Sequence, residues 1–268
     1  MTFAFADPAT ELYGLARLGL SGGEGSALAL LFAGREPVAA LARGGLPVDG
    51  GFEQLALPGL AATVDEPLRR WTVAFGDEDG FELAFEALAA PAVLEADEPA
   101  AQAGGMVGYE QLCRVAGTVR AGGRTREVRC AGQRGHSWGE PVWDRIAAAR
   151  TVTAWLEDGT GVALSSIRPA GADDHAGEAT WASLLAPAGS LRVDDPRLST
   201  TYDADGRQRR AGLELWVGEE DAYPRRAAGV AICGAELDLG RLRLDCAFFR
   251  WWMDGRPGVG RYDILRRA

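Results

Sequence analysis

Residues 132–144 read Gly-Gln-Arg-Gly-His-Ser-Trp-Gly-Glu-Pro-Val-Trp-Asp, and they separate two halves of the chain that share one pattern. The stretch contains one of the two histidines and two of the eight tryptophans. On either side, short runs of alternating apolar and polar residues lie between Gly- and Asp-rich turns, which is the signal of β-hairpins. No long segment has the 3.6-residue period of a helix. The pattern predicts an all-β sandwich or barrel.

Hairpins can be placed along most of the chain. They are expected to join residues 12–20 to 27–32, 68–75 to 81–86, 107–120 to 124–133, 143–156 to 162–168, 191–202 to 207–217, and 225–239 to 241–253. Residues 35–66 are rich in Gly and Pro and should be irregular, with a short strand near Phe52–Leu57. Residues 87–104 should form a loop with a helical turn. Because hairpins recur in both halves, we expect two consecutive antiparallel β-barrels, residues 1–140 and 141–268.

Composition narrows the classes of function. Hydrophobic residues make up 47% and charged residues 25%, as in ordinary globular proteins. The formal net charge of −10 argues against nucleic acid or an anionic membrane surface as a partner. No apolar run approaches the roughly 20 residues of a membrane span, and no signal-peptide pattern opens the chain. We therefore expect a soluble, cytoplasmic protein.

Cofactor chemistry is not indicated by the sequence. The chain has no lysine, which excludes Schiff-base and Walker-type lysine chemistry. Its cysteines are widely spaced and lie beside apolar strand residues, so free buried thiols are expected. Two distant histidines without clustered ligands argue against zinc, and no Gly-x-Gly-x-x-Gly opens a helix. We expect neither a metal nor an organic cofactor.

The strand that leads into the opening stretch predicts a pocket. If residues 124–138 are extended, alternate side chains share a face, which carries Val128 and Cys130 together with Arg134, His136 and Trp138. The apolar members should point into a barrel interior, and they carry the imidazole and the indole with them. A glycine-induced bulge would break this phase.

The same count applies to the last hairpin. Arg250 and Trp252 share a face with Leu244 and Phe248, which places them at the rim of an apolar wall. Asp245 then points outward.

Several further residues complete the candidate site. Glu140 and Asp144 are the preferred acids, Trp143 offers an aromatic face, and Tyr109 lies at a plausible strand mouth. A His beside a Trp in a strand is more often a hydrogen-bonded core residue, so a structural role stays open. His175 is interpreted as an exposed loop residue. The pair Ser165-Ser166 lacks the Gly-x-Ser-x-Gly elbow of a serine hydrolase.

The segment Gly132–Gly139, followed by Trp143, resembles the His-(Ser/Asn)-Trp-Gly motif of the lipocalin-like carotenoid hydratases (hydroxyneurosporene synthases) and their actinobacterial relatives. The resemblance implies two consecutive lipocalin-like barrels with an apolar ligand tunnel. It also implies cofactor-independent acid catalysis on an isoprenoid alkene, by hydration or cyclisation. Related calycin-fold proteins catalyse pericyclic ring closures of polyketides. The family's His and Trp correspond to His136 and Trp138.

Two functions therefore compete. One is a cofactor-independent hydro-lyase or cyclase in which His136 orients or deprotonates water, Glu140 or Asp144 supplies the proton, and the aromatic residues stabilise a cation. The other is a calycin-type carrier or sensor that binds a hydrophobic small molecule without transforming it. The family's Asp before the His is replaced by Gly135, which favours binding. The substrate and the oligomeric state, a homodimer included, stay open.

Overall fold

The chain folds almost entirely into strands. The computed structural model describes residues 1–48, 50–172, 175, 177–218 and 223–268. In chain order the elements are β1 (Thr2–Asp7), β2 (Leu12–Ser21), β3 (Glu24–Ala33), β4 (Glu36–Pro47), β5 (Gln54–Leu57), β6 (Leu60–Glu66), β7 (Arg70–Phe75), β8 (Gly80–Ala87), β9 (Ala92–Leu94), α1 (Pro99–Gly104), β10 (Met106–Ala121), β11 (Arg124–Gly139), the 3-10 turn η1 (Trp143–Arg145), β12 (Ile146–Leu156), β13 (Gly161–Pro169), β14 (Ala179–Ala186), β15 (Gly189–Arg192), β16 (Asp195–Tyr202), β17 (Gln208–Trp216), β18 (Arg225–Asp238), β19 (Leu242–Met253) and β20 (Arg256–Arg267).

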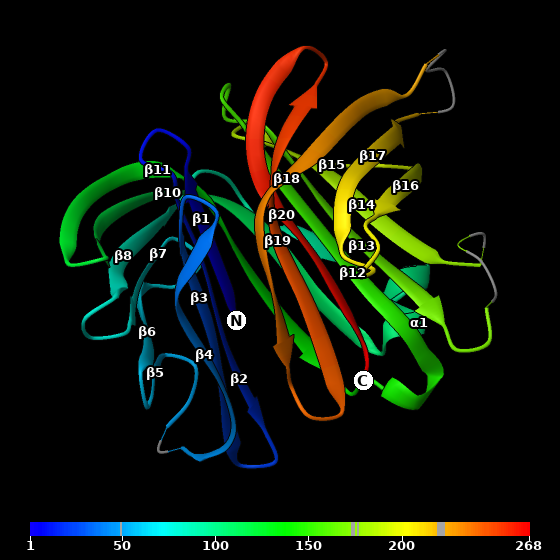
Figure 1. The fold of residues 1–268 in the computed structure, drawn as a ribbon. Helices are drawn as coiled ribbons and strands as arrows, with labels where there is room; N and C mark the ends of the chain where they lie inside the picture. Colours follow the sequence, from blue (N-terminus) through cyan, green and yellow to red (C-terminus); the bar gives the residue numbers. More distant parts are fainter. Residues whose placement is uncertain (49, 173–174, 176, 219–222) are drawn as a thin grey trace. The chain divides into compact units, whose positions relative to one another are not determined.

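Within the described residues these strands form two antiparallel sheets (Figure 1). One has eleven strands in the order β4-β3-β2-β1-β11-β10-β8-β7-β6-β5, with β9 pairing to β10. The other has nine strands in the order β15-β14-β13-β12-β20-β19-β18-β17-β16. Each sheet curls back on itself, because β3 contacts β5 and β6 in the first and β14 contacts β16 in the second. The predicted all-β fold of two barrel-like sheets is confirmed.

Two of the tight turns show why hairpins form where the sequence predicts them. Gly22 and Gly23, between β2 and β3, have φ values of +59° and +83°. Gly122 and Gly123, between β10 and β11, have φ values of +59° and +72°. Two consecutive residues with positive φ are what a two-residue type I′ hairpin requires, and glycine adopts that conformation without a steric penalty.

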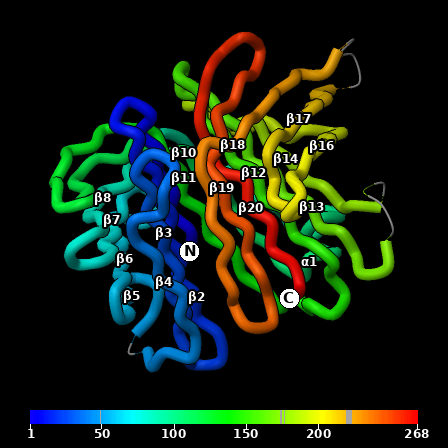
Figure 2. The backbone as a smooth tube through the Cα atoms, in the orientation of Figure 1, coloured from blue at the N-terminus to red at the C-terminus, as the bar shows by residue number. Residues whose placement is uncertain are grey.

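The chain divides into two compact units, and each of them combines two separate segments. Unit 1 contains Met1–Ala90 and Gln111–His136, and unit 2 contains Pro91–Glu110 and Ser137–Ala268. Strands β10 and β11 therefore each contribute to both units, as the backbone trace of Figure 2 lets the reader follow. The excursion of residues 91–110 into unit 2 was not expected.

The core of unit 1 is built from every second residue of its strands. Phe3 and Phe5 of β1 pack against Phe85 and Phe81 of β8, with ring centroids 5.2 and 5.4 Å apart. Most of the remaining large members come from β2, β3, β5, β6, β7, β8, β10 and β11, and all of them are less than a tenth exposed. Trp71 belongs to the same cluster. One face of the sheet therefore forms a continuous apolar interior.

The core of unit 2 follows the same rule. Phe249 and Trp251 of β19 and Tyr262 of β20 are fully buried beside the apolar residues of β12, β13 and β14. The helix α1 adds Ala100 and Ala101, which are 2% and 3% exposed, and α1 contacts β13 and β14.

Some sequence expectations about elements are wrong. Residues 35–66 are not irregular, since they contain β4, β5 and β6. The expected single strand over residues 191–202 is divided into β15 and β16. Strands β1 and β14 had no counterpart in the prediction. None of the helices in the described parts of the chain is long and apolar enough to cross a membrane.

Candidate functional site

The inward face of β11 leads from the core of unit 1 to the predicted site. Val128 belongs to the core cluster, and Cys130 packs against it. At Gly132 an added Cβ would lie 2.5 Å from the Ala4 carbonyl oxygen and 2.6 Å from Val115 Cγ2, so only glycine fits between β1 and β10. The phase is kept through this glycine, because the next inward residue, Arg134, contacts the core residue Trp71.

Arg134 is a cation held inside an apolar core. Its guanidinium carbon lies 3.9 Å from the centroid of the Trp71 ring, and the residue is 3% exposed. A desolvated cation–π contact of this kind contributes about 2 kcal/mol. The guanidinium is therefore fixed in orientation as well as in charge.

His136 follows on the same face, beside an aromatic ring. Its imidazole centroid lies 4.8 Å from that of Phe52, in an edge-to-face arrangement. Burial, together with the charges of the Met1 amino group and Arg134, lowers the pKa of His136 to about 4. The imidazole is therefore neutral at pH 7, with one nitrogen that accepts a proton or hydrogen bond and one N–H that donates.

The motif Trp does not share this interior. Trp138 is 51% exposed and makes an edge contact with Tyr109, with centroids 6.3 Å apart. The prediction that Trp138 points inward with Arg134 and His136 is wrong, because β11 passes from unit 1 to unit 2 after His136. Gly139 then allows a close approach to α1, since an added Cβ would lie 2.2 Å from the Gly105 carbonyl oxygen.

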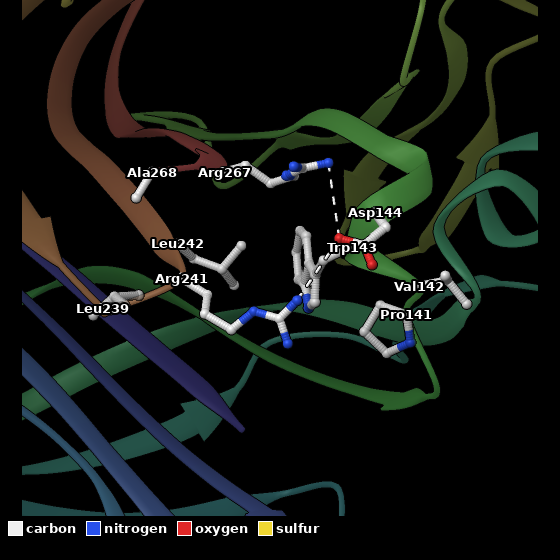
Figure 3. A pocket seen from close by; sticks show the side chains of 10 residues that line it. Pro141, Val142, Trp143, Asp144, Leu239, Arg241, Leu242, Arg267 and Ala268 are labelled. Carbon is white, nitrogen blue, oxygen red and sulfur yellow. Dashed lines mark ion pairs between the residues drawn. The ribbon is translucent and has the colours of Figure 1, made fainter.

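The two predicted acids are exposed. Glu140 lies at the surface. The Asp144 side chain is 70% exposed, and its Oδ1 lies 3.7 Å from a nitrogen of Arg241 and 3.8 Å from one of Arg267. Figure 3 shows both ion pairs. They lie in an open groove of about 710 Å³ that Trp143 also lines. Neither acid occupies the apolar pocket that a protonated catalytic carboxyl group requires.

From Arg250 onward, the side of β19 that was expected to face the interior is exposed. The residues of this strand in the core cluster of unit 2 are Ala247, Phe249, Trp251 and Met253. Arg250 is exposed and Trp252 is 42% exposed, so the prediction that they form part of an interior wall is wrong.

Asp245 lies on the side of β19 that faces the interior, not on the side that faces solvent. It is 2% exposed, and it accepts hydrogen bonds from Arg266. The expectation that it points to solvent is wrong. Between Leu244 and Phe249, residues on both faces of the strand are buried. The sequence there does not alternate between apolar and polar residues, so it could not show which face points inward.

A second polar cluster, which no sequence motif indicates, lies inside unit 2. Its members are the buried Arg150, Ser166 and Tyr262, the buried side chain of Glu178 and the partly exposed Thr180 and Thr200, with His175 half-exposed beside them. Glu178 accepts hydrogen bonds from Arg150 and from Ser166 Oγ at 2.5 Å, and its Oε1 lies 2.5 Å from His175 Nδ1. His175 was interpreted as a loop residue, and no local motif joins it to the distant Arg150.

The charges in this cluster stabilise one another. Burial alone would raise the pKa of Glu178, but hydrogen bonds from Ser166 and His175 and the charge of Arg150 lower it below its ordinary value. Burial would lower the pKa of Arg150, and the neighbouring Tyr262 and Glu178 raise it instead. Burial also raises the pKa of Tyr262 to about 12. The cluster therefore holds an ionised carboxylate, a guanidinium and a neutral phenol.

The four cysteines are not joined in disulfides. Burial raises the pKa of Cys130 to about 12, with a further contribution from Asp7, and burial raises that of Cys233 to about 12. Thiols of this kind are poor nucleophiles. Across the described ranges, no three His, Cys, Asp or Glu side chains gather as they would around a metal ion.

The chain belongs to the family described as "Domain of unknown function (DUF7064)", whose model matches residues 1–268. A comparison with curated proteins found no match.

Solved structures share the fold at low sequence identity. Kievitone hydratase from Nectria haematococca is 10% identical with a TM-score of 0.69, and the match covers 100% of this chain and 87% of that one. A putative AttH from Nitrosomonas europaea is 15% identical with a TM-score of 0.67, covering 98% and 90%. CghA, solved with Sch210972, is 12% identical with a TM-score of 0.67, covering 100% and 87%. These are lipocalin-like barrel proteins, so the expected lipocalin-like architecture is confirmed.

Proposed function

We propose that this chain is a cofactor-independent lyase or cyclase that acts on an apolar isoprenoid or polyketide alkene inside unit 1. One observation carries the proposal. A neutral imidazole, His136, and a buried cation, Arg134, stand next to each other on an inward face whose other walls are the rings of Trp71 and Phe52. A low-dielectric interior makes the electrostatic effect of such groups on a bound substrate larger than it would be in water.

Of the two reactions, cyclisation fits this geometry better than hydration. Hydration begins with proton transfer to the alkene, and the predicted donors Glu140 and Asp144 are exposed. A pericyclic ring closure needs no proton donor, because its bonds form and break in one cyclic shift of electrons within one folded substrate. In our proposal Arg134 donates hydrogen bonds to a carbonyl group conjugated with the alkene and so polarises it. His136 orients the same carbonyl, and the aromatic rings hold the substrate in its folded shape.

The alternative is a non-catalytic carrier or sensor for a hydrophobic small molecule. The exposure of Glu140 and Asp144 is the observation that favours it, since a barrel without a buried acid can hold an apolar ligand unchanged. The resemblance to hydratases bears on the fold and leaves the choice to experiment.

The test is an assay of purified protein with a panel of terpenoid and polyketide alkenes in deuterated water. Cyclisation gives a product of unchanged mass that has lost its diene absorbance, whereas hydration gives deuterium at carbon. Saturable quenching of tryptophan fluorescence without any product would support the carrier and overturn the enzyme proposal.

His136→Gln tests the site within that assay. Glutamine has a donor and an acceptor but places them differently from the two ring nitrogens, so the preorganised contact with the substrate carbonyl is lost, and we expect the rate to fall by about 10²- to 10³-fold. Ser137→Ala is the matched control, because Ser137 is the next residue of β11 and is exposed. Equal activity of His136→Gln and Ser137→Ala would show that the assigned site is wrong.

A further inference from the structure

The outer face of the sheet in unit 2 carries an exposed indole. Trp252 of β19 is 42% exposed, whereas its neighbours Trp251 and Met253 belong to the core cluster. A single exposed apolar side chain is ordinary on a protein surface. The surroundings of Trp252 are what set it apart.

Three small residues lie beside Trp252 in one row across the sheet. On β18, β17 and β16 the residues in register with it are Ala228, Gly212 and Ser199. Residues that stand opposite one another in this way share a face of the sheet. Neighbouring strands are about 4.8 Å apart, so the row extends about 14 Å from the indole. Because its side chains are so short, the surface beside Trp252 is low.

A second row, two residues along each strand, consists of charged side chains. Its members come from β16, β17, β18 and the turn after β19, and they are Arg197, Glu214, Arg226 and Asp254. Their charges alternate in sign along the row. Arg226 and Glu214 form an ion pair of 3.2 Å, with side chains 72% and 41% exposed. Both groups therefore keep hydrogen-bonding capacity that faces solvent.

An open groove of about 630 Å³ follows these two rows, and Trp252 lines it at the β19 end. Its depth depends on Gly212. An added Cβ at this position would lie 2.7 Å from Ser199 Oγ, and the Ser199 hydroxyl donates a hydrogen bond to the Gly212 carbonyl oxygen at 3.3 Å. The groove therefore offers a ligand real space on the surface of the sheet.

The lining of the groove selects the class of ligand. Its charged residues are two arginines and two acids, so it attracts neither an anion nor a cation by net charge. Alternating guanidinium and carboxylate groups instead offer donors and acceptors side by side, which suits adjacent hydroxyl groups. The indole offers a flat apolar surface. A pyranose ring with equatorial hydroxyl groups matches both, because its hydroxyls lie at the rim and its C–H bonds lie on the faces.

We propose that this groove binds a neutral, linear oligosaccharide, with one pyranose ring stacked on Trp252 and the next rings over Ala228 and Gly212. The hydroxyl groups on one side of the sugar chain then face the row of charged residues. The row of small residues gives the ligand its length, since a single ring would leave most of the groove empty. The proposal is independent of the function proposed for unit 1.

Isothermal titration calorimetry of the full chain with cellotriose, a linear trimer of glucose, tests this site. We expect saturable binding by the wild type, and an affinity lower by about tenfold or more in Trp252→Ala, as when a central aromatic contact is removed. Gly212→Val should weaken binding as well, because its side chain fills the groove and leaves the indole in place. In the NMR spectrum of bound cellotriose, ring C–H protons should move upfield in the wild type and not in Trp252→Ala.

Trp138→Ala is the matched control, because Trp138 is 51% exposed and does not line the groove. Its affinity for cellotriose should equal that of the wild type. The matching trimer of glucuronic acid should bind no more tightly than cellotriose, since the lining has no excess of positive charge.

Three results would overturn the proposal. The first is a wild type that shows no saturable binding of cellotriose, including the case in which sedimentation shows that Trp252 instead joins two copies of the chain. The second is equal affinity in Trp252→Ala and Trp138→Ala. The third is clearly tighter binding of the glucuronic acid trimer, which would assign the groove to anions.

Discussion

His136 and His175 are the two imidazoles of this chain, and their surroundings differ in kind. His136 lies beside Phe52 and near two positive charges, whereas His175 is half-exposed beside the carboxylate of Glu178. Burial and like charge both disfavour a second positive charge at His136. The neutral form of His136 is therefore a property of the fold and needs no bound ligand.

The low pKa of His136 predicts a specific titration. An imidazole ring proton in the NMR spectrum should shift with a midpoint near pH 4 and stay constant above pH 6. His136→Gln identifies the signal, because only one other histidine contributes to that region. A midpoint near the ordinary value of 6.5 would show that the imidazole is not desolvated.

The same pKa predicts how stability depends on pH. The unfolded chain binds a proton at His136 below pH about 6.5, whereas the folded chain binds it only below about 4. The unfolded state therefore holds more protons between these values, and the contribution of this residue to stability is lost as pH falls from 6.5 to 4. Urea midpoints at pH 7 and pH 5, followed by tryptophan fluorescence, should differ less in His136→Gln than in the wild type. An equal difference in the two proteins would contradict this linkage.

At this scale the period-two count found Arg134 and His136 but could not find Glu178. Arg134 and His136 lie on one strand, so the alternation of residues along the sequence is enough to place them on the same face. Glu178 meets Arg150 and Ser166 only because β12, β13 and the residues before β14 are neighbours in space. Its local sequence contains no motif for that role.

At the scale of elements, β11 shows what a strand gains from glycine. Gly132 pairs with Phe5 of β1, and there is no space for a side chain between the backbone of β1 and Val115 of β10. The close approach of the two strands brings Arg134 onto Trp71 two residues later.

Gly132→Ala should therefore destabilise the protein by about 1 to 3 kcal/mol through overpacking. Gly44→Ala is the control, because Gly44 lies in β4 with open space around its Cα and an exposed position. The control should change stability by less than about 0.5 kcal/mol. Chemical denaturation of both variants measures the difference, and similar stabilities would refute the steric argument.

The prediction of strands and of their inward faces failed where the sequence does not alternate clearly between apolar and polar residues. On β19, residues of both faces are buried, so Phe248 and Phe249 are equally good candidates for the interior. On β4, glycine and proline suggest a loop, but the strand pairs along its length with β3. In both cases tertiary contacts outweigh the local preference.

At the scale of the whole molecule, the segments of the two units alternate along the chain. Two barrels could be predicted, because hairpin signals recur in both halves. The excursion of residues 91–110 could not, because its alanine-rich sequence is equally typical of an exposed loop. Only the structure shows that Ala100 and Ala101 are buried and that Gly104 approaches Ile167 of β13.

This interleaving predicts that residues 141–268 do not form a complete domain. The isolated fragment should expose the surface of β13 and β14 that α1 covers, and should bind a hydrophobic dye such as ANS. A peptide of residues 91–110 added in trans should reduce the dye fluorescence, helped by the ion pair of Glu98 with Arg192 at 2.5 Å. A scrambled peptide of the same composition should have no effect. A fragment that binds no dye by itself would refute this prediction.

The interleaving of the two units also has a consequence for synthesis on the ribosome. Residues 91–110 leave the exit tunnel well before β13 and β14, the strands that α1 contacts, have been translated. At typical elongation rates that interval is on the order of ten seconds, far longer than a hairpin takes to form. Unit 1 has all its residues once His136 has emerged, so vectorial synthesis favours completing it first. During that interval the nascent chain presents the apolar side of α1 to solvent, and this is the window in which a chaperone would have most to bind.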